Sequence, residues 1–211
     1  MEDALCSGLL LITGGPGTGK TTILNGILEL LGQMQLRCLL AAPTGRAAKR
    51  LTEVTGEEAS TIHRLLEATI DTNSGEMYFV RDEENPLKTD VIIVDECQFL
   101  LPEQIDQLRS IVNDYNIPVM CFGLRTDFQT KMFEGSRRLF EIADTIDEIK
   151  STCSCGRKTI VNARIDSNGD IITVGEQVEI GGNDRYIAVC RKCWRNKRIE
   201  HSDRNSLPFD K

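Results

Sequence analysis

The glycine-rich segment that ends at Thr22 constrains this chain of 211 residues more than any other feature. It reads Gly14-x4-Gly19-Lys20-Thr21, follows the short apolar run 9–13, and precedes a helical pattern with apolar residues at 23, 24, 27, 28 and 31. Glycines let the backbone N–H groups of such a loop converge on phosphate oxygens, and the positive end of the next helix adds to that attraction. The sequence therefore predicts a Walker A phosphate-binding loop that opens an α/β domain. We assign phosphate binding to Gly14, Gly15, Pro16, Gly17, Thr18, Gly19, Lys20, Thr21 and Thr22.

A pair of carboxylates supplies the second half of this predicted site. The β-branched run 91–94 ends at Asp95 and Glu96, which places both acids at the carboxyl end of a buried strand. Asp95 is expected to hold Mg²⁺ together with the hydroxyl of Thr21, while Lys20 reaches the β and γ phosphates of ATP. Glu96 is then placed to take a proton from an attacking hydroxyl or water. Lys20, Asp95 and Glu96 are thus the candidate catalytic residues, with ATP and Mg²⁺ as cofactors.

The rest of the chain repeats the alternation of apolar strands and helical patterns. Further strands are expected at 38–42, 91–94 and 118–122, one more at 77–80, and helices at 47–54, at 61–66 and after Pro102. Such alternation predicts a parallel sheet with helices on both faces, the RecA-like fold of P-loop NTPases. This domain is expected to span 1–149. Short strands, glycines and cysteines then indicate a small β-rich lobe at 150–198, followed by a polar tail at 199–211.

Four of the eight cysteines form two close pairs, Cys153-x-Cys155 and Cys190-x2-Cys193. That count and pairing are typical of a closed tetrahedral site for structural Zn²⁺, which would pin the small lobe; free thiols or a disulfide are the alternatives. The remaining four are expected to be core or near-core thiols: Cys6, Cys38, Cys97 and Cys121. Without a recognisable secretory signal, eight cysteines favour a cytosolic protein with reduced thiols.

Charge and hydropathy exclude some classes of partner. The net charge of -7 argues against non-specific binding of nucleic acid, which needs a basic surface. Six basic residues between Arg185 and Arg198 are expected to be a solvated face beside the metal site. No apolar run approaches the roughly 18 residues of a membrane span, so no membrane partner is expected.

Six segments within residues 90–194 carry a pattern known from one family: Val94-Asp-Glu-Cys-Gln-Phe-Leu100, Gly123-Leu-Arg-Thr-Asp-Phe128, Phe133-Glu-Gly-Ser136, Cys153-Ser-Cys-Gly-Arg157, Ile180-Gly-Gly-Asn-Asp-Arg-Tyr186 and Cys190-Arg-Lys-Cys193. With these segments, residues 90–194 resemble thymidine kinases of the type shared by bacteria and animal cytosol. The resemblance implies transfer of the ATP γ-phosphate to the 5′-hydroxyl of thymidine or deoxyuridine, with Glu96 as the base, and a homotetramer.

The same resemblance implies an acceptor pocket. The loop between the two cysteine pairs would close over the nucleoside as a lasso, which makes the small lobe a lasso domain. Taken without the resemblance, the three phenylalanines of this set are expected to be core residues. The resemblance places Phe99, Phe128 and Phe133 around thymine, Leu124 against it, backbone groups near Tyr186 on its edge, Asn162 near the base and Arg164 near the phosphates.

Three segments within residues 9–66 carry the pattern of a different family: Thr13-Gly-Gly-Pro-Gly-Thr-Gly-Lys-Thr-Thr22, Ala42-Pro-Thr-Gly-Arg-Ala-Ala-Lys-Arg-Leu51 and Ser60-Thr-Ile-His-Arg-Leu-Leu66. With these segments, residues 9–66 resemble the first motor domain of RecD-like superfamily 1 helicases. A helicase needs two motor domains, for which this chain has no room, and its motif after the Walker B strand is replaced by the segment that starts at Gly123.

Two alternatives to a kinase remain open: a DNA-stimulated ATPase fragment, in which Arg46 and Lys49 would contact DNA, and a chimera that binds ATP without turnover. Arg46, Lys49 and Arg50 are expected to form a solvated helix face. His63 is expected to be packed or exposed rather than catalytic.

Overall fold

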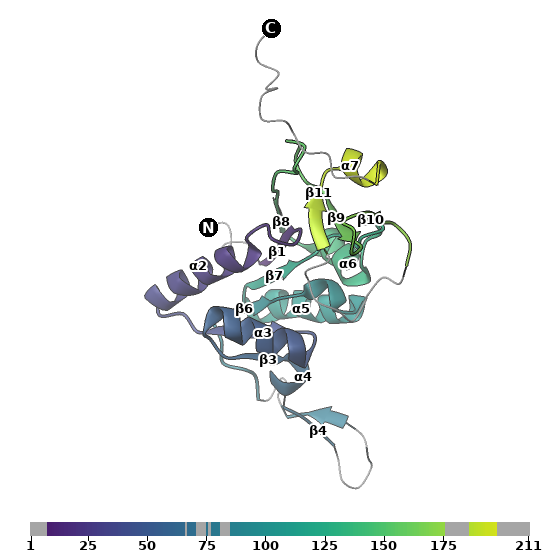
Figure 1. Ribbon diagram of the computed structural model, residues 1–211. Coiled ribbons are helices and arrows are strands. Elements are labelled where there is room, and N and C mark those ends of the chain that lie inside the picture. Colours follow the sequence, from purple (N-terminus) through teal and green to yellow (C-terminus); the bar gives the residue numbers. More distant parts are fainter. Residues whose placement is uncertain are drawn as a thin grey trace.

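A six-stranded sheet forms the centre of the computed structural model (Figure 1). The structure describes residues 8–65, 67–70, 75, 77–80, 85–175 and 186–197. The strand order is β3-β2-β6-β7-β1-β8, and every pairing in this sheet is parallel. The loops after β1, β6 and β7 therefore leave the same edge of the sheet, next to one another. The strands are β1 (Leu9–Gly14), β2 (Cys38–Ala42), β3 (Ala59–Thr61), β6 (Val91–Val94), β7 (Val119–Gly123) and β8 (Thr145–Ile149).

Helices cover both faces of the sheet, as the alternation of side chains along β1 requires. Leu10 and Ile12 pack against α2 and α3 on one face, whereas Leu9 and Leu11 pack against α5 and α6 on the other. This arrangement confirms the predicted P-loop NTPase fold. The helices are α2 (Lys20–Gln33), α3 (Gly45–Thr55), α4 (Ile62–Leu65), the 3₁₀ helix η1 (Cys97–Phe99), α5 (Pro102–Tyr115) and α6 (Glu134–Ile142).

A small second sheet lies beyond the carboxyl edge of the large one (Figure 1). Its strands are antiparallel in the order β10-β9-β11, and the cysteine-bearing segments and α7 pack on it to form a core of their own. A hairpin of β4 and β5 projects from the opposite end of the molecule. The bounds are β4 (Ala68–Ile70), β5 (Met77–Phe79), β9 (Val161–Ile165), β10 (Ile171–Ile172), β11 (Tyr186–Val189) and α7 (Arg191–Arg195).

Most of the predicted elements are confirmed, with differences of detail. The predicted helix at 61–66 is a four-residue helix preceded by the edge strand β3. Ile23, predicted on the inner face of α2, is 40% exposed, while the other predicted inward positions of that helix are buried or partly buried. The structure adds α6 and β8, which the sequence pattern had not indicated. In the part of the chain that the structure describes, no helix is long and apolar enough to cross a membrane. Cys6 and the tail at 199–211 lie outside the described residues.

Candidate active site

The predicted phosphate loop lies between β1 and α2 with the geometry its glycines allow. Gly17 and Gly19 have φ of 69° and 90°, values that residues with a side chain rarely adopt. The Lys20 ammonium donates hydrogen bonds to the carbonyls of Gly14 at 2.5 Å and Gly15 at 2.9 Å. Burial lowers the pKa of Lys20, an effect that the charge of Asp95 opposes. The loop therefore presents its amides and one partly desolvated cation at the edge of the sheet.

Asp95 and Glu96 leave β6 beside this loop. The Asp95 amide donates to the Ala41 carbonyl at 2.9 Å, which continues the sheet pairing to the first acidic residue. Glu96 then takes a left-handed backbone conformation, φ 52°, and starts η1. Burial raises the pKa of both carboxyls, and the negative charge of Asp95 raises that of Glu96 further. A carboxylate with a raised pKa is a stronger proton acceptor than an ordinary glutamate, as a general base requires.

One cavity of about 660 Å³ joins the phosphate loop to the predicted acceptor residues. Residues 16–21 of the loop line it together with both carboxylates. Its volume lies in the range of ordinary small-molecule sites. The cavity can therefore hold a triphosphate and an acceptor in one enclosure. Of the residues that the sequence assigned to the acceptor, it is lined by Phe99, Leu124, Phe128, Phe133, Asn162 and Tyr186.

The aromatic wall of the cavity comes from two segments, because Phe99 ends η1 while Phe128 and Phe133 lie in the loop between β7 and α6. Phe99 and Phe133 meet edge to face, with ring centroids 5.6 Å apart and planes at 76°. Phe128 and Phe133 are buried, while Phe99 is 40% exposed. Phe128 and Phe133 are thus buried and also line the cavity, while their packing around thymine stays a prediction. A wall of this kind suits the flat face of a heterocyclic base.

Arg164 is buried against the aromatic wall. Its guanidinium stacks 3.8 Å above the centroid of the Phe128 ring, and its Nε donates to the Tyr186 hydroxyl at 3.1 Å. The side chain is 4% exposed and is not among the described residues that line the cavity. Arg164 therefore supports the aromatic wall, and its implied place near the phosphates stays a prediction.

Asn162 and Tyr186 lie at the junction between the small sheet and the phosphate loop. The Asn162 amide donates to the Thr126 carbonyl at 3.0 Å, and its oxygen would lie 2.7 Å from a Cβ added at Gly15. Tyr186 is the first residue of β11, and the backbone groups just before it lie outside the described residues. The lasso loop at 176–185 also falls outside them, so its closure over the cavity stays a prediction.

Two buried polar residues that the sequence analysis missed hold the main chain of Leu124. The Gln98 side-chain oxygen accepts from the Leu124 amide at 3.0 Å, and the Ser136 hydroxyl donates to the Leu124 carbonyl at 2.5 Å. Both residues lie inside the segments that resemble thymidine kinases, and this resemblance is the one sequence feature that could have pointed to them. Their role depends on contacts 26 and 12 positions away, which no local pattern reveals.

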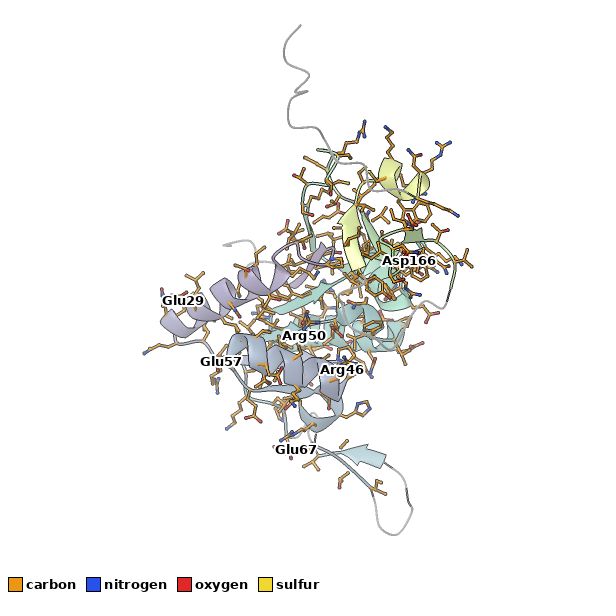
Figure 2. The ribbon with its side chains drawn as sticks, viewed as in Figure 1. Glu29, Arg46, Arg50, Glu57, Glu67 and Asp166 are labelled. Carbon is orange, nitrogen blue, oxygen red and sulfur yellow. The ribbon has the colours of Figure 1, made fainter. Side chains whose placement is uncertain are left out.

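Arg50 is a third residue that the sequence analysis missed. It projects from α3 (Figure 2), where it is exposed as expected for a solvated helix face, and it also lines the cavity beside the phosphate loop. Its positive charge lowers the pKa values of Lys20, Asp95 and Glu96. The segment that resembles a helicase therefore contributes a cation to this site.

The four clustered cysteines converge in the small lobe. Their sulfurs all lie within 4.8 Å of one another, with Cys155–Cys190 at 3.4 Å and Cys153–Cys193 at 3.8 Å. All four are free thiols. A tetrahedral Zn²⁺ with Zn–S bonds of about 2.3 Å separates its sulfurs by about 3.8 Å, so these residues fit that ion. Burial acts to raise the pKa of Cys155, but hydrogen bonds from the Arg157 backbone and the other thiols bring it down to about 6.

Comparisons with known proteins match one family over most of the chain. A family model described as thymidine kinase matches residues 7–194, which include the phosphate loop and α3. The chain is 43% identical to a thymidine kinase of Ruegeria pomeroyi over 180 residues, 84% of this chain and 88% of that one. It is 39% identical to the thymidine kinase of Idiomarina loihiensis, in a match that covers 84% of this chain and 90% of that one. It is 53% identical to the thymidine kinase of Zymomonas mobilis, in a match that covers 52% of this chain and 55% of that one.

Among solved structures, the Pif1 helicase of Candida albicans aligns with 74% of this chain and 38% of its own. The TM-score is 0.47 at 18% identity, too low to support an inference.

Proposed function

The chain belongs to the thymidine kinase family, and on that premise we propose that it transfers the γ-phosphate of ATP to the 5′-hydroxyl of thymidine or deoxyuridine. One observation carries the proposal: the phosphate loop, the carboxylate pair and the aromatic wall line a single cavity. Phosphoryl transfer needs little covalent help from the protein, and positioning plus charge stabilisation account for most of the catalysis. A shared enclosure supplies the positioning.

On the donor side, the loop amides and Lys20 hold the phosphates of ATP. Thr21 and Asp95 offer a hydroxyl and a carboxylate, the hard oxygen ligands that Mg²⁺ prefers, so the residues present fit that ion. When bound, Mg²⁺ would neutralise charge on the phosphate oxygens. Arg50 adds a positive charge on the same cavity, where negative charge develops on the transferring group.

On the acceptor side, Glu96 takes the proton of the 5′-hydroxyl. The hydroxyl oxygen forms a new bond to the γ-phosphorus, the bond from that phosphorus to the bridging β–γ oxygen breaks, and ADP leaves with the bond pair. The base would lie against the aromatic wall, with Leu124 held in place by Gln98 and Ser136. Enclosure keeps water from competing with the nucleoside as the phosphate acceptor.

We propose that the helicase-like first half is part of this kinase site and not a DNA motor. Its α3 supplies Arg50 and Leu51 to the cavity, and the family match runs through it. A recombined origin of the two halves is a proposal that rests on the matching segments alone. Single-stranded DNA should leave the rate of ATP hydrolysis unchanged; stimulation that Arg46 or Lys49 substitutions abolish would support the ATPase alternative instead.

We also propose a cytosolic homotetramer with structural zinc. Family membership supports the assembly, and the free thiols of the described cysteines agree with a reducing compartment. Zinc would join the two cysteine-bearing segments of the small lobe and stabilise its small core, which has seven buried residues in the described part of the lobe.

The test supplies purified zinc-loaded protein with γ-labelled ATP and either thymidine or deoxyuridine. Label should appear in the nucleoside monophosphate, and Glu96→Gln should reduce its rate of formation. A folded, zinc-loaded protein that binds ATP but forms no nucleoside monophosphate would refute the proposal and support the alternative without turnover.

A further inference from the structure

Trp194 links the cysteine cluster to the aromatic wall of the cavity. It is the only tryptophan of the chain and directly follows Cys193 in α7. Its indole N–H donates to the main-chain carbonyl of Phe128 at 2.9 Å, a contact between residues 66 positions apart. The guanidinium of Arg191 lies over the Trp194 ring, 4.8 Å from its centroid.

This contact is one of several hydrogen bonds between the small lobe and the loop 124–133, which lines the acceptor end of the cavity. Asn162 donates to the carbonyl of Thr126 at 3.0 Å, two residues before Phe128. Gln129, one residue after it, donates its side-chain amide to the Gly175 carbonyl at 2.6 Å. The Phe128 ring is itself 1% exposed under the guanidinium of Arg164. The small lobe therefore helps to hold the turn that carries Phe128, together with the hydrogen bonds that the Asp127 side chain accepts within the turn.

The cysteine cluster in turn fixes the indole. Helix α7 has five residues, too few to be stable alone. Its N-cap is Cys190, whose sulfur accepts from the Cys193 amide at 3.5 Å, and Cys193 is fully buried among the other thiols. An ion held by the four sulfurs would fix both ends of the first turn of α7, and hence the direction of the next side chain.

We propose that Trp194 is a positioning residue through which metal occupancy of the cysteine cluster sets the affinity of the acceptor pocket for its nucleoside. With the ion bound, the indole N–H holds the Phe128 carbonyl and keeps the ring against the base. Without the ion, α7 loses its anchor and the wall relaxes, while the phosphate loop, on β1 and α2, keeps its affinity for ATP. The inference rests on the proposed function and names how its acceptor site is controlled.

The first experiment compares Trp194→Phe with Arg191→Gln. The phenylalanine keeps an aromatic ring and removes the N–H donor; the glutamine removes the cation over the ring and keeps the donor. Calorimetry should show thymidine binding about tenfold weaker in Trp194→Phe, because a buried carbonyl loses its partner. Its affinity for ATP and its content of zinc, one per chain, should match the wild type. Arg191→Gln should bind both ligands as the wild type does.

The second experiment uses the fluorescence of the sole tryptophan in the wild type. Thymidine should change the emission of the zinc-loaded protein. After removal of zinc by a chelator, the emission should shift to the red and the response to thymidine should weaken, with ATP binding retained.

Two results would overturn the coupling alone: a zinc-loaded Trp194→Phe that binds thymidine as tightly as wild type, or a zinc-free wild type that does so. A zinc-loaded wild type that binds ATP but no nucleoside would overturn the proposed function as well.

Discussion

Gly135 allows η1 to pack tightly against α6, and replacing it by alanine tests how that contact shapes the acceptor end. A Cβ at this position would lie 2.5 Å from the Leu100 carbonyl oxygen and 2.7 Å from that of Cys97. Non-bonded heavy atoms normally approach no closer than about 3.5 Å, so the backbones of η1 and α6 must separate by about 1 Å. Overpacking of this kind costs about 1–3 kcal/mol.

Gly26 is the matched control, since it lies in α2 with nothing within 4 Å of an added Cβ. Gly26→Ala gains about 1 kcal/mol of helix propensity in the interior of α2, and Gly135→Ala, at the second residue of α6, gains no more than that. In urea unfolding, Gly135→Ala should therefore be less stable than Gly26→Ala by about 1–3 kcal/mol. Gly26→Ala itself should be more stable than the wild type.

Gly135→Ala should affect the binding of thymidine and not that of ATP. The backbone that must move is that of η1, which carries Gln98 and Phe99 into the cavity. Gly135→Ala should therefore raise the KM for thymidine and leave the KM for ATP close to that of the wild type. Equal stability of the two variants, or a KM for thymidine unchanged in Gly135→Ala, would refute this reasoning.

Four further predictions concern Glu96, Arg50 and the phosphate loop. Glu96→Gln should lower kcat by about 10²–10⁴-fold with both substrates still bound, as measured by steady-state kinetics and calorimetry. Because burial raises the pKa of Glu96 and only its deprotonated form accepts a proton, kcat/KM of the wild type should fall on the acid side at a pH above 4.5, the ordinary glutamate value. Arg50 lowers that pKa, so Arg50→Gln should move the acid limb to higher pH and the neighbouring Lys49→Gln should not; identical pH profiles would contradict the placement of Arg50. Gly15→Ala would bring a Cβ within 2.7 Å of Asn162 and should raise the KM for both substrates, whereas an effect on ATP alone would argue against contact between the loop and the small lobe.

The parts of the site that the sequence predicted correctly depend on short-range rules. The phosphate loop must follow a strand and precede a helix, and Asp95 must leave the end of a buried strand, so their positions follow from local pattern. The cysteine cluster was predicted from the spacing of two close pairs. The pairing of β9 with β11 brings these pairs together, because one pair precedes β9 and the other follows β11.

What the sequence could not predict depends on contacts across the fold. The resemblance implies Arg164 near phosphate, and no local pattern reveals its stacking on Phe128 or its hydrogen bond to the Tyr186 hydroxyl. Arg50 is exposed on α3 as expected, but only the packing of α3 on the sheet shows that it also lines the cavity. Strand β8 was missed because its Ile146 and Asp147 are both exposed at the edge of the sheet, which removes the continuous apolar run of a buried strand.

The most direct test of the central claim is a single-turnover experiment with γ-labelled ATP and excess thymidine on the zinc-loaded protein. If donor and acceptor share one cavity with Glu96 between them, the label should pass to thymidine monophosphate with little free phosphate released, and Glu96→Gln should slow this transfer. Label that appears mainly as inorganic phosphate, at a rate independent of thymidine, would contradict the account.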